Sequence, residues 1–209
     1  MQLHLIEDCL DAGVTLSLPA SPGRAIYVCA GAISRDGQDH GADEGFAASG
    51  ALTLVAGPAG ACLWRFDLSA PGTGGAGHRA TPRLSGEVPG PLRGPDAFLR
   101  LDAVAFPPGG TALLHVHRGP GIRCLREGSI RIDTQGHSTS YGPGSPWFEA
   151  GPDPVFAQAD MRVASRFIRA MVLPAEIAGK SSIRYVNAGD ADKPKSQSYR
   201  QFGEAPLVP

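Results

Sequence analysis

Hydrophobic residues in this chain occur in short runs separated by turns, and this pattern predicts β-strands rather than helices. In the first half, three runs are rich in strand-forming residues, at 24–34, 46–56 and 61–68. In the second half, similar runs occur at 98–106, 112–117, 122–125, 129–133, 145–149, 155–158 and 163–173. Short strands at such intervals favour a β-sandwich or a β-barrel.

The composition supports the same fold class. The chain has 209 residues, of which 28 are glycine and 19 are proline. Without a fixed repeat period, that density is typical of many short strands joined by tight turns, and it argues against a helical bundle. A single helical turn is expected at 175–178. Four cysteines, Cys9, Cys29, Cys62 and Cys124, form no C-x-x-C pair, so a zinc ribbon is not expected.

Charge and hydropathy exclude several classes of partner. The 19 basic residues balance 20 acidic ones, and no basic stripe marks a nucleic-acid surface. No apolar run approaches the roughly 18 residues that span a bilayer. The N-terminus lacks a basic segment followed by an apolar one, so we expect no secretion signal and no membrane partner. We therefore expect a cytoplasmic protein with reduced thiols.

The hydrophobic pattern weakens between the two halves. Residues 69–95 are rich in glycine and proline and show almost no periodicity, which predicts a linker. We expect a domain boundary near residue 90, with domains at 1–90 and 91–175. Residues 176–209 contain too many apolar residues for a disordered tail. They are interpreted as an extended arm that packs on the barrel or on a neighbouring subunit.

Candidate chemistry begins at His115-Val116-His117, inside the predicted strand 112–117. Because side chains alternate faces along a strand, Leu113, His115 and His117 are expected to share one face. Two imidazoles about 7 Å apart on one face can both reach a single metal ion. The alternative is a pair of structural histidines satisfied by hydrogen bonds. The remaining histidines, including His40, His78 and His137, are expected to be exposed.

The second half resembles the cupin superfamily over residues 96–173. Gly109 leads through five residues into His115-Val116-His117, and Gly128 closes this first motif. Gly136 and Gly144 occupy the two glycine positions of the second motif, with Gly142 where that motif has proline. The resemblance implies an all-β jelly-roll, or double-stranded β-helix, barrel.

The chain departs from the family at two metal ligands. The family's glutamate aligns with Gly121, and its third histidine aligns with Trp147. The first half, residues 24–68, resembles a cupin half that has lost its histidines. The resemblance thus implies a bicupin in which only the second barrel keeps part of a metal site.

Glu149 is the candidate third ligand or general base, because Trp147 and Glu149 share a strand face. Two histidines and one carboxylate with open positions form a recognised site for non-haem iron or zinc. Arg123 is expected to point inward, where a buried guanidinium must be paired or must bind an anion. Two roles stay open for Arg123: orienting a substrate carboxylate, or forming an ion pair with Glu149.

These features predict a metal-binding cupin protein that carries Fe, Mn, Zn or Ni and binds a small anionic substrate. Oxygenation of an organic acid is the leading reaction, with isomerase or lyase chemistry as an alternative. A second hypothesis is a non-catalytic cupin module that binds a ligand or a structural metal. A third is a storage or structural role. In each case we expect a homodimer.

Overall fold

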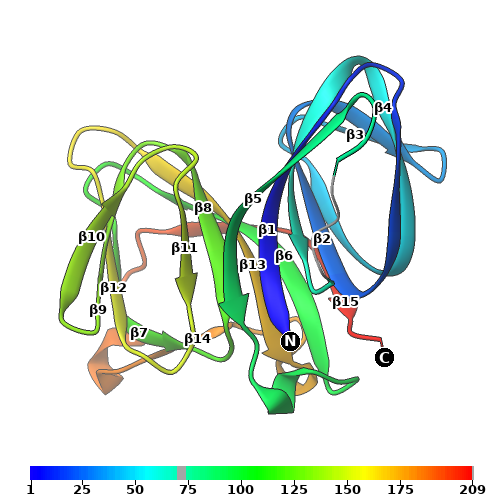
Figure 1. Ribbon diagram of the computed structural model, residues 1–209. Coiled ribbons are helices and arrows are strands. Elements are labelled where there is room, and N and C mark those ends of the chain that lie inside the picture. Colours follow the sequence, from blue (N-terminus) through cyan, green and yellow to red (C-terminus); the bar gives the residue numbers. More distant parts are fainter. Residues whose placement is uncertain (70–73, 209) are drawn as a thin grey trace.

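The computed structural model of this chain describes residues 1–69 and 74–208 and is built almost entirely of β-strands (Figure 1). The strands of the first half are β1 (Gln2–Leu10), β2 (Thr15–Arg35), β3 (Gln38–Gly41), β4 (Gly45–Asp67) and β5 (His78–Glu87). The following strands are β6 (Ala97–Phe106), β7 (Thr111–His117), β8 (Gly121–Glu127), β9 (Ile130–Thr134), β10 (His137–Tyr141), β11 (Pro146–Glu149), β12 (Val155–Ala159) and β13 (Ser165–Pro174). The C-terminal segment adds β14 (Ile183–Tyr185) and β15 (Ser198–Pro206). The expected all-β class is confirmed.

Helical structure in the described residues is limited to three short turns, η1 (Gly90–Leu92), η2 (Ala175–Ile177) and η3 (Ala188–Asp190). The turn expected at 175–178 is therefore confirmed. Across residues 1–69 and 74–208, no helix is long and apolar enough to span a membrane.

The first half is one curled sheet with the strand order β3-β2-β4-β1-β5. Its two long strands bend so that β2 meets β4 twice: Arg24 pairs with both Ala48 and Asp67, and Tyr27 pairs with both Gly45 and Trp64. Side chains on the inner face form a closed apolar cluster that includes Ile26, Val28, Leu52, Leu54 and Leu63.

The segment predicted as a linker contains an edge strand, β5. Residues 70–73 lie outside the described residues, but β5 pairs along the whole of β1. The prediction of a linker was wrong there. The register skips a residue beside Pro82, and most side chains of β5 are exposed. An edge strand tolerates proline at such a bulge and needs no continuous apolar face, so the hydrophobic pattern is weak.

The second half consists of two five-stranded sheets, ordered β10-β9-β12-β7-β14 and β11-β8-β13-β6-β15. Both strands of the C-terminal arm complete these sheets: β14 pairs with β7, and β15 pairs with β6. Figure 1 shows this arm, in orange and red, running from the second half toward the first. The arm therefore packs on its own chain.

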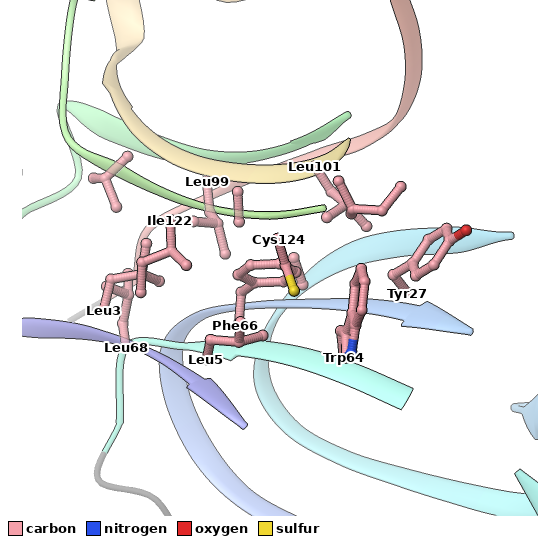
Figure 2. Close-up of a cluster of buried hydrophobic side chains, with 14 of the residues drawn as sticks. Leu3, Leu5, Tyr27, Trp64, Phe66, Leu68, Leu99, Leu101, Ile122 and Cys124 are labelled. Carbon is pink, nitrogen blue, oxygen red and sulfur yellow. The ribbon is translucent and has the colours of Figure 1, made fainter. Parts of the chain in front are cut away.

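A shared hydrophobic core joins the two halves (Figure 2). From the first half, Leu5, Tyr27 and Phe66 point into it; from the second, Leu101 and Ile122 do so. These residues alternate with the ones that face the interior of each half. Alternation along the strands thus creates two barrel interiors and, between them, one interface.

Candidate metal centre

The two histidines of β7 face the interior of the second half because of a β-bulge. Val155 of β12 pairs with His115, whereas Ala157 pairs with Ala112, so β7 contains one extra residue. Ala112, His115 and His117 are all buried and line the same cavity. The expectation that Leu113 shares the face of the histidines was wrong, since the bulge shifts the alternation at this point.

The two imidazoles approach each other closely. The Nε2 atoms of His115 and His117 are 3.3 Å apart, and the rings are nearly perpendicular at 89°. The Nδ1 atom of His115 lies 2.7 Å from the carbonyl oxygen of Leu113. Because a carbonyl only accepts, Nδ1 carries the proton and Nε2 keeps its lone pair. A histidine that donates its one N–H to a backbone carbonyl, with the other ring nitrogen unprotonated, has the usual arrangement of a metal ligand.

Glu149 reaches the same cavity from β11. As expected, Trp147 and Glu149 share the buried face of this strand, and the indole Nε1 of Trp147 donates to the carboxylate Oε1 of Glu149 at 2.8 Å. The other carboxylate oxygen, Oε2, lies 2.9 Å from the Nε2 atom of His117. Glu149 is 8% exposed, so this carboxylate is nearly dehydrated.

Arg123 of β8 holds the same carboxylate oxygen. Its guanidinium lies 2.9 Å from Oε2 of Glu149, donates to the carbonyl oxygen of Gly121 at 2.6 Å, and is buried. The family's glutamate would stand at Gly121, where an added Cβ would lie 2.5 Å from the carbonyl oxygen of Ala170. No larger side chain fits there without a backbone shift.

Burial and the guanidinium set the protonation states of the cluster. Burial and Arg123 lower the pKa of His117 to about 3, and burial also lowers the pKa of His115. Burial alone would raise the pKa of Glu149, but Arg123 and His117 hold it well below its usual range. Burial lowers the pKa of Arg123 to about 10. At neutral pH the cluster therefore contains neutral imidazoles, a carboxylate and a guanidinium, with no net charge.

The cavity between these side chains is small. It has a volume of about 20 Å³. That volume holds one water molecule or one ion but no organic substrate. Its walls are apolar, formed by residues such as Val104, Phe106, Ile132 and Phe167. A low-dielectric wall of this kind strengthens the charge interactions inside the cavity.

The imidazole pair fits a divalent transition metal. Separations of 3.3 Å and 2.9 Å match those between ligands that each lie about 2.0–2.2 Å from one ion. Yet in the described chain no group of three or more His, Cys, Asp or Glu side chains is arranged as a complete metal site. The donors form two overlapping pairs that share His117. Glu149 fits as a third ligand only if the metal ion takes the place of the Arg123 guanidinium beside the Oε2 atom of Glu149.

A second, larger pocket of about 280 Å³ adjoins this cavity, and Arg169, Ile183 and Tyr199 line both. Arg169 forms a two-point ion pair with Asp102 at 2.8 Å and 2.7 Å. The sequence analysis did not identify any of these residues as part of the site. For Asp102 and Arg169 a signal was available: each is a charged residue inside an apolar strand, 98–106 or 163–173, and a buried charge requires a partner.

The first half contains a buried ion network. Arg65 donates to Asp8 at 2.7 Å and to Asp67 at 3.0 Å, and Arg24 donates to Asp67 at 2.7 Å. His78 joins this network, with its Nε2 atom 2.8 Å from Asp8.

The expected exposure of the remaining histidines is only partly correct. His78 is not exposed, and His40 is 8% exposed and packs on Phe46. His137 is exposed, as expected.

Comparisons with known proteins identify the fold. No protein-family model matches the sequence, and no curated protein matches it. Among solved structures, the formate complex of Lactobacillus farciminis oxalate decarboxylase matches with a TM-score of 0.62 at 14% identity, covering 91% of this chain and 82% of that one. Bacillus subtilis oxalate decarboxylase at pH 4.6 matches with a TM-score of 0.63 at 13% identity, over 92% of this chain and 72% of that one.

A cupin 2 conserved barrel domain protein from Leptotrichia buccalis also matches, with a TM-score of 0.51 at 10% identity, covering 81% of this chain and 82% of that one. At these identities the likeness is one of fold. The chain therefore has an all-β, cupin-like fold, as the motif around His115 and His117 predicts.

Proposed function

We propose that the chain is a metal-binding cupin protein whose second barrel holds one divalent transition metal at His115 and His117. The convergence of the two Nε2 atoms at 3.3 Å, with the proton of His115 held on Nδ1 by Leu113, carries this proposal. Glu149 is the third ligand once Arg123 releases its Oε2 atom. A bound metal of this class polarises a substrate oxygen or activates water or dioxygen.

We propose further that the substrate is a small organic acid bound in the adjoining pocket. The volume of about 280 Å³ lies just below the ~300–1,000 Å³ typical of ligand pockets, so it suits a small molecule. Lys180 lines this pocket, and its ammonium group contacts the carbonyl oxygen of Glu176 at 3.1 Å rather than a carboxylate. Lys180 is thus the cation available to an acid, because Glu204 and Asp102 neutralise the other two cations of this pocket, Arg100 and Arg169.

Residues of the pocket and of the cavity have different roles in the proposed function. Lys180 binds the acid, Tyr199 and Ile183 separate the pocket from the histidines, and the apolar walls limit the cavity to about one water molecule or ion. As the alternative to ligation, Glu149 acts as a general base at Oε2 when Arg123 moves away, because the guanidinium is the strongest of the influences that lower its pKa. Oxygenation is the leading reaction class, and a lyase or isomerase reaction is the alternative.

Metal analysis tests the proposal. Protein purified without a histidine tag from cells supplied with Fe, Mn, Zn and Ni should contain about one equivalent of one metal, removable by chelators. His115→Ala and His117→Ala should lose it, whereas His137→Ala, at an exposed position, should retain it. Iron would favour an oxygenase, and zinc a lyase or a structural role. A parent protein without metal contradicts the proposal.

A second candidate function is a non-catalytic binding module. The ion pair between Arg123 and Glu149 at 2.9 Å favours it, because the guanidinium already supplies the positive charge that a metal would bring. In that case the parent protein contains no metal, and small acids still bind in the pocket beside Lys180.

We also propose that the first half is a cupin half without a metal site, which makes the chain a bicupin. The network of Asp8, Arg24, Arg65 and Asp67 supports this, since its buried carboxylates are already paired with guanidinium groups. Three further statements remain predictions: the division into domains at 1–90 and 91–175, the homodimer, and the cytoplasmic location.

A further inference from the structure

Outside the candidate metal centre, two cysteines face each other on adjacent strands of the first half. Cys9 of β1 and Cys62 of β4 are directly paired in the antiparallel register. Their sulfur atoms are 3.0 Å apart. All four cysteines of the chain are free thiols, and both members of this pair are half-buried.

The backbone at this pair suits a disulfide. Residues directly opposite on antiparallel strands have Cα atoms about 4.5 or 5.5 Å apart. Disulfides span Cα distances of about 4.4–6.8 Å. A bond between the sulfur atoms of Cys9 and Cys62 therefore requires their approach by only about 1 Å, to the usual S–S length of about 2.05 Å.

A cation and an open pocket adjoin the pair. On the other side of Cys9, Arg79 of the edge strand β5 is its direct partner, and the Arg79 guanidinium donates to the Cys9 sulfur at 3.6 Å. The three side chains thus form a row across three strands. Cys9, Cys62 and Arg79 also line a surface pocket of about 300 Å³, which gives small oxidants access to both sulfur atoms.

We infer that Cys9 and Cys62 form a redox-active dithiol that hydrogen peroxide converts to a disulfide. Cys9, whose sulfur the guanidinium of Arg79 contacts at 3.6 Å, is the attacking sulfur. Its sulfur takes one peroxide oxygen, the O–O bond breaks, and the other oxygen leaves as hydroxide and becomes water on protonation. The Cys62 sulfur then displaces the hydroxyl group of the Cys9 sulfenic acid, the S–S bond forms, and a second water leaves. Two thiols are oxidised by two electrons, and one peroxide is reduced to two waters.

The two cysteines have different environments, which supports these roles. The hydrogen bond that the Cys62 thiol donates to the Cys9 sulfur, together with burial, raises the pKa of Cys62 to about 11. Cys62 therefore stays protonated at neutral pH and follows as the resolving thiol. Burial also raises the pKa values of Cys29 and Cys124 far above neutrality, so these two thiols are poor competitors for the oxidant.

Hydrogen peroxide is the probe that tests this inference. The reduced full-length chain, treated with a small excess of peroxide, should lose two of its four thiols and two hydrogen atoms of intact mass, and digestion should yield a Cys9–Cys62 linked peptide. Cys62→Ser should instead accumulate a sulfenic acid at Cys9 that a dimedone probe captures, and Cys9→Ser should form no disulfide.

Cys124→Ser is the control and should still form the Cys9–Cys62 disulfide. Retention of all four thiols by the treated parent chain overturns the inference, as does a disulfide that involves Cys29 or Cys124. If a serine variant fails to fold, the peptide map of the parent chain decides alone. The test needs no metal, so its outcome is independent of the proposed function.

Discussion

The guanidinium of Arg123 and the Nε2 atom of His117 both lie 2.9 Å from the same carboxylate oxygen of Glu149. This oxygen is where a metal held by His117 would find its third ligand. The position of Arg123 therefore determines whether Glu149 is available to an ion. Because the three groups are buried, leaving the Glu149 carboxylate without either cation is strongly unfavourable.

Removing the guanidinium of Arg123 should make the free energy of unfolding depend on bound metal. Arg123→Gln leaves the Glu149 carboxylate buried without its cation, and we expect a loss of about 3–5 kcal/mol in the free energy of unfolding of the chelator-treated protein. Adding Zn or Mn should restore much of that loss. Urea unfolding with and without metal measures both effects. Arg131→Gln is the control, because its ion pair with Asp133 is exposed and should contribute about 0–1 kcal/mol. Equal losses in the two variants would contradict this prediction.

Acidification should destabilise the metal-free protein before the carboxylates titrate. Burial lowers the pKa of His117 from 6.5 to about 3, so below pH 6.5 the unfolded chain binds a proton that the folded chain does not. The free energy of unfolding is therefore largest above pH 6.5 and decreases as the pH falls toward 3, by about 1.4 kcal/mol per pH unit for each such histidine. His117→Gln should reduce this slope, and the exposed His137→Gln should not. A slope unchanged by His117→Gln would show that other groups cause the pH dependence.

The C-terminal arm should stabilise its own chain through Leu207. This side chain is 2% exposed and packs into the core shared by the two halves. Leu207→Ala is expected to lower the free energy of unfolding by about 2–5 kcal/mol. Val208→Ala, at a neighbouring position that is 40% exposed, should change it by less than about 0.5 kcal/mol. Urea titrations at two protein concentrations check this prediction. A Leu207→Ala effect that disappears on dilution would indicate instead that the arm stabilises a dimer.

Lys180 should determine the affinity for small acids. Calorimetric titration with a series of small mono- and dicarboxylates should detect binding to the parent protein, and Lys180→Gln should weaken it by about tenfold, equivalent to ~1.4 kcal/mol. Lys193→Gln serves as the matched control, since Lys193 already pairs with Asp190. Equal affinities of the parent and Lys180→Gln would place the acid elsewhere.

Much of the candidate site was predictable because it depends on local alternation. His115 and His117 share a face because they are two residues apart in a strand, and the same rule relates Trp147 to Glu149. The bulge that removes Leu113 from that face was not predictable, because it arises from pairing with β12. The residues of the adjoining pocket, such as Arg169 and Tyr199, lie on strands distant in sequence from the histidines. Their proximity depends on strand order.

The sequence by itself determined the all-β class and the faces of the strands, because turn residues and the period of two act over a few neighbouring positions. Tertiary structure decided the rest. The edge strands β5 and β15 have weak apolar patterns and are recruited by backbone pairing with β1 and β6. The contact between Arg123 and Glu149 also depends on long-range register, since β8 and β11 must pair in one alignment for the two charges to meet. Such pairings are set by the burial of the whole sheet, which no short segment encodes.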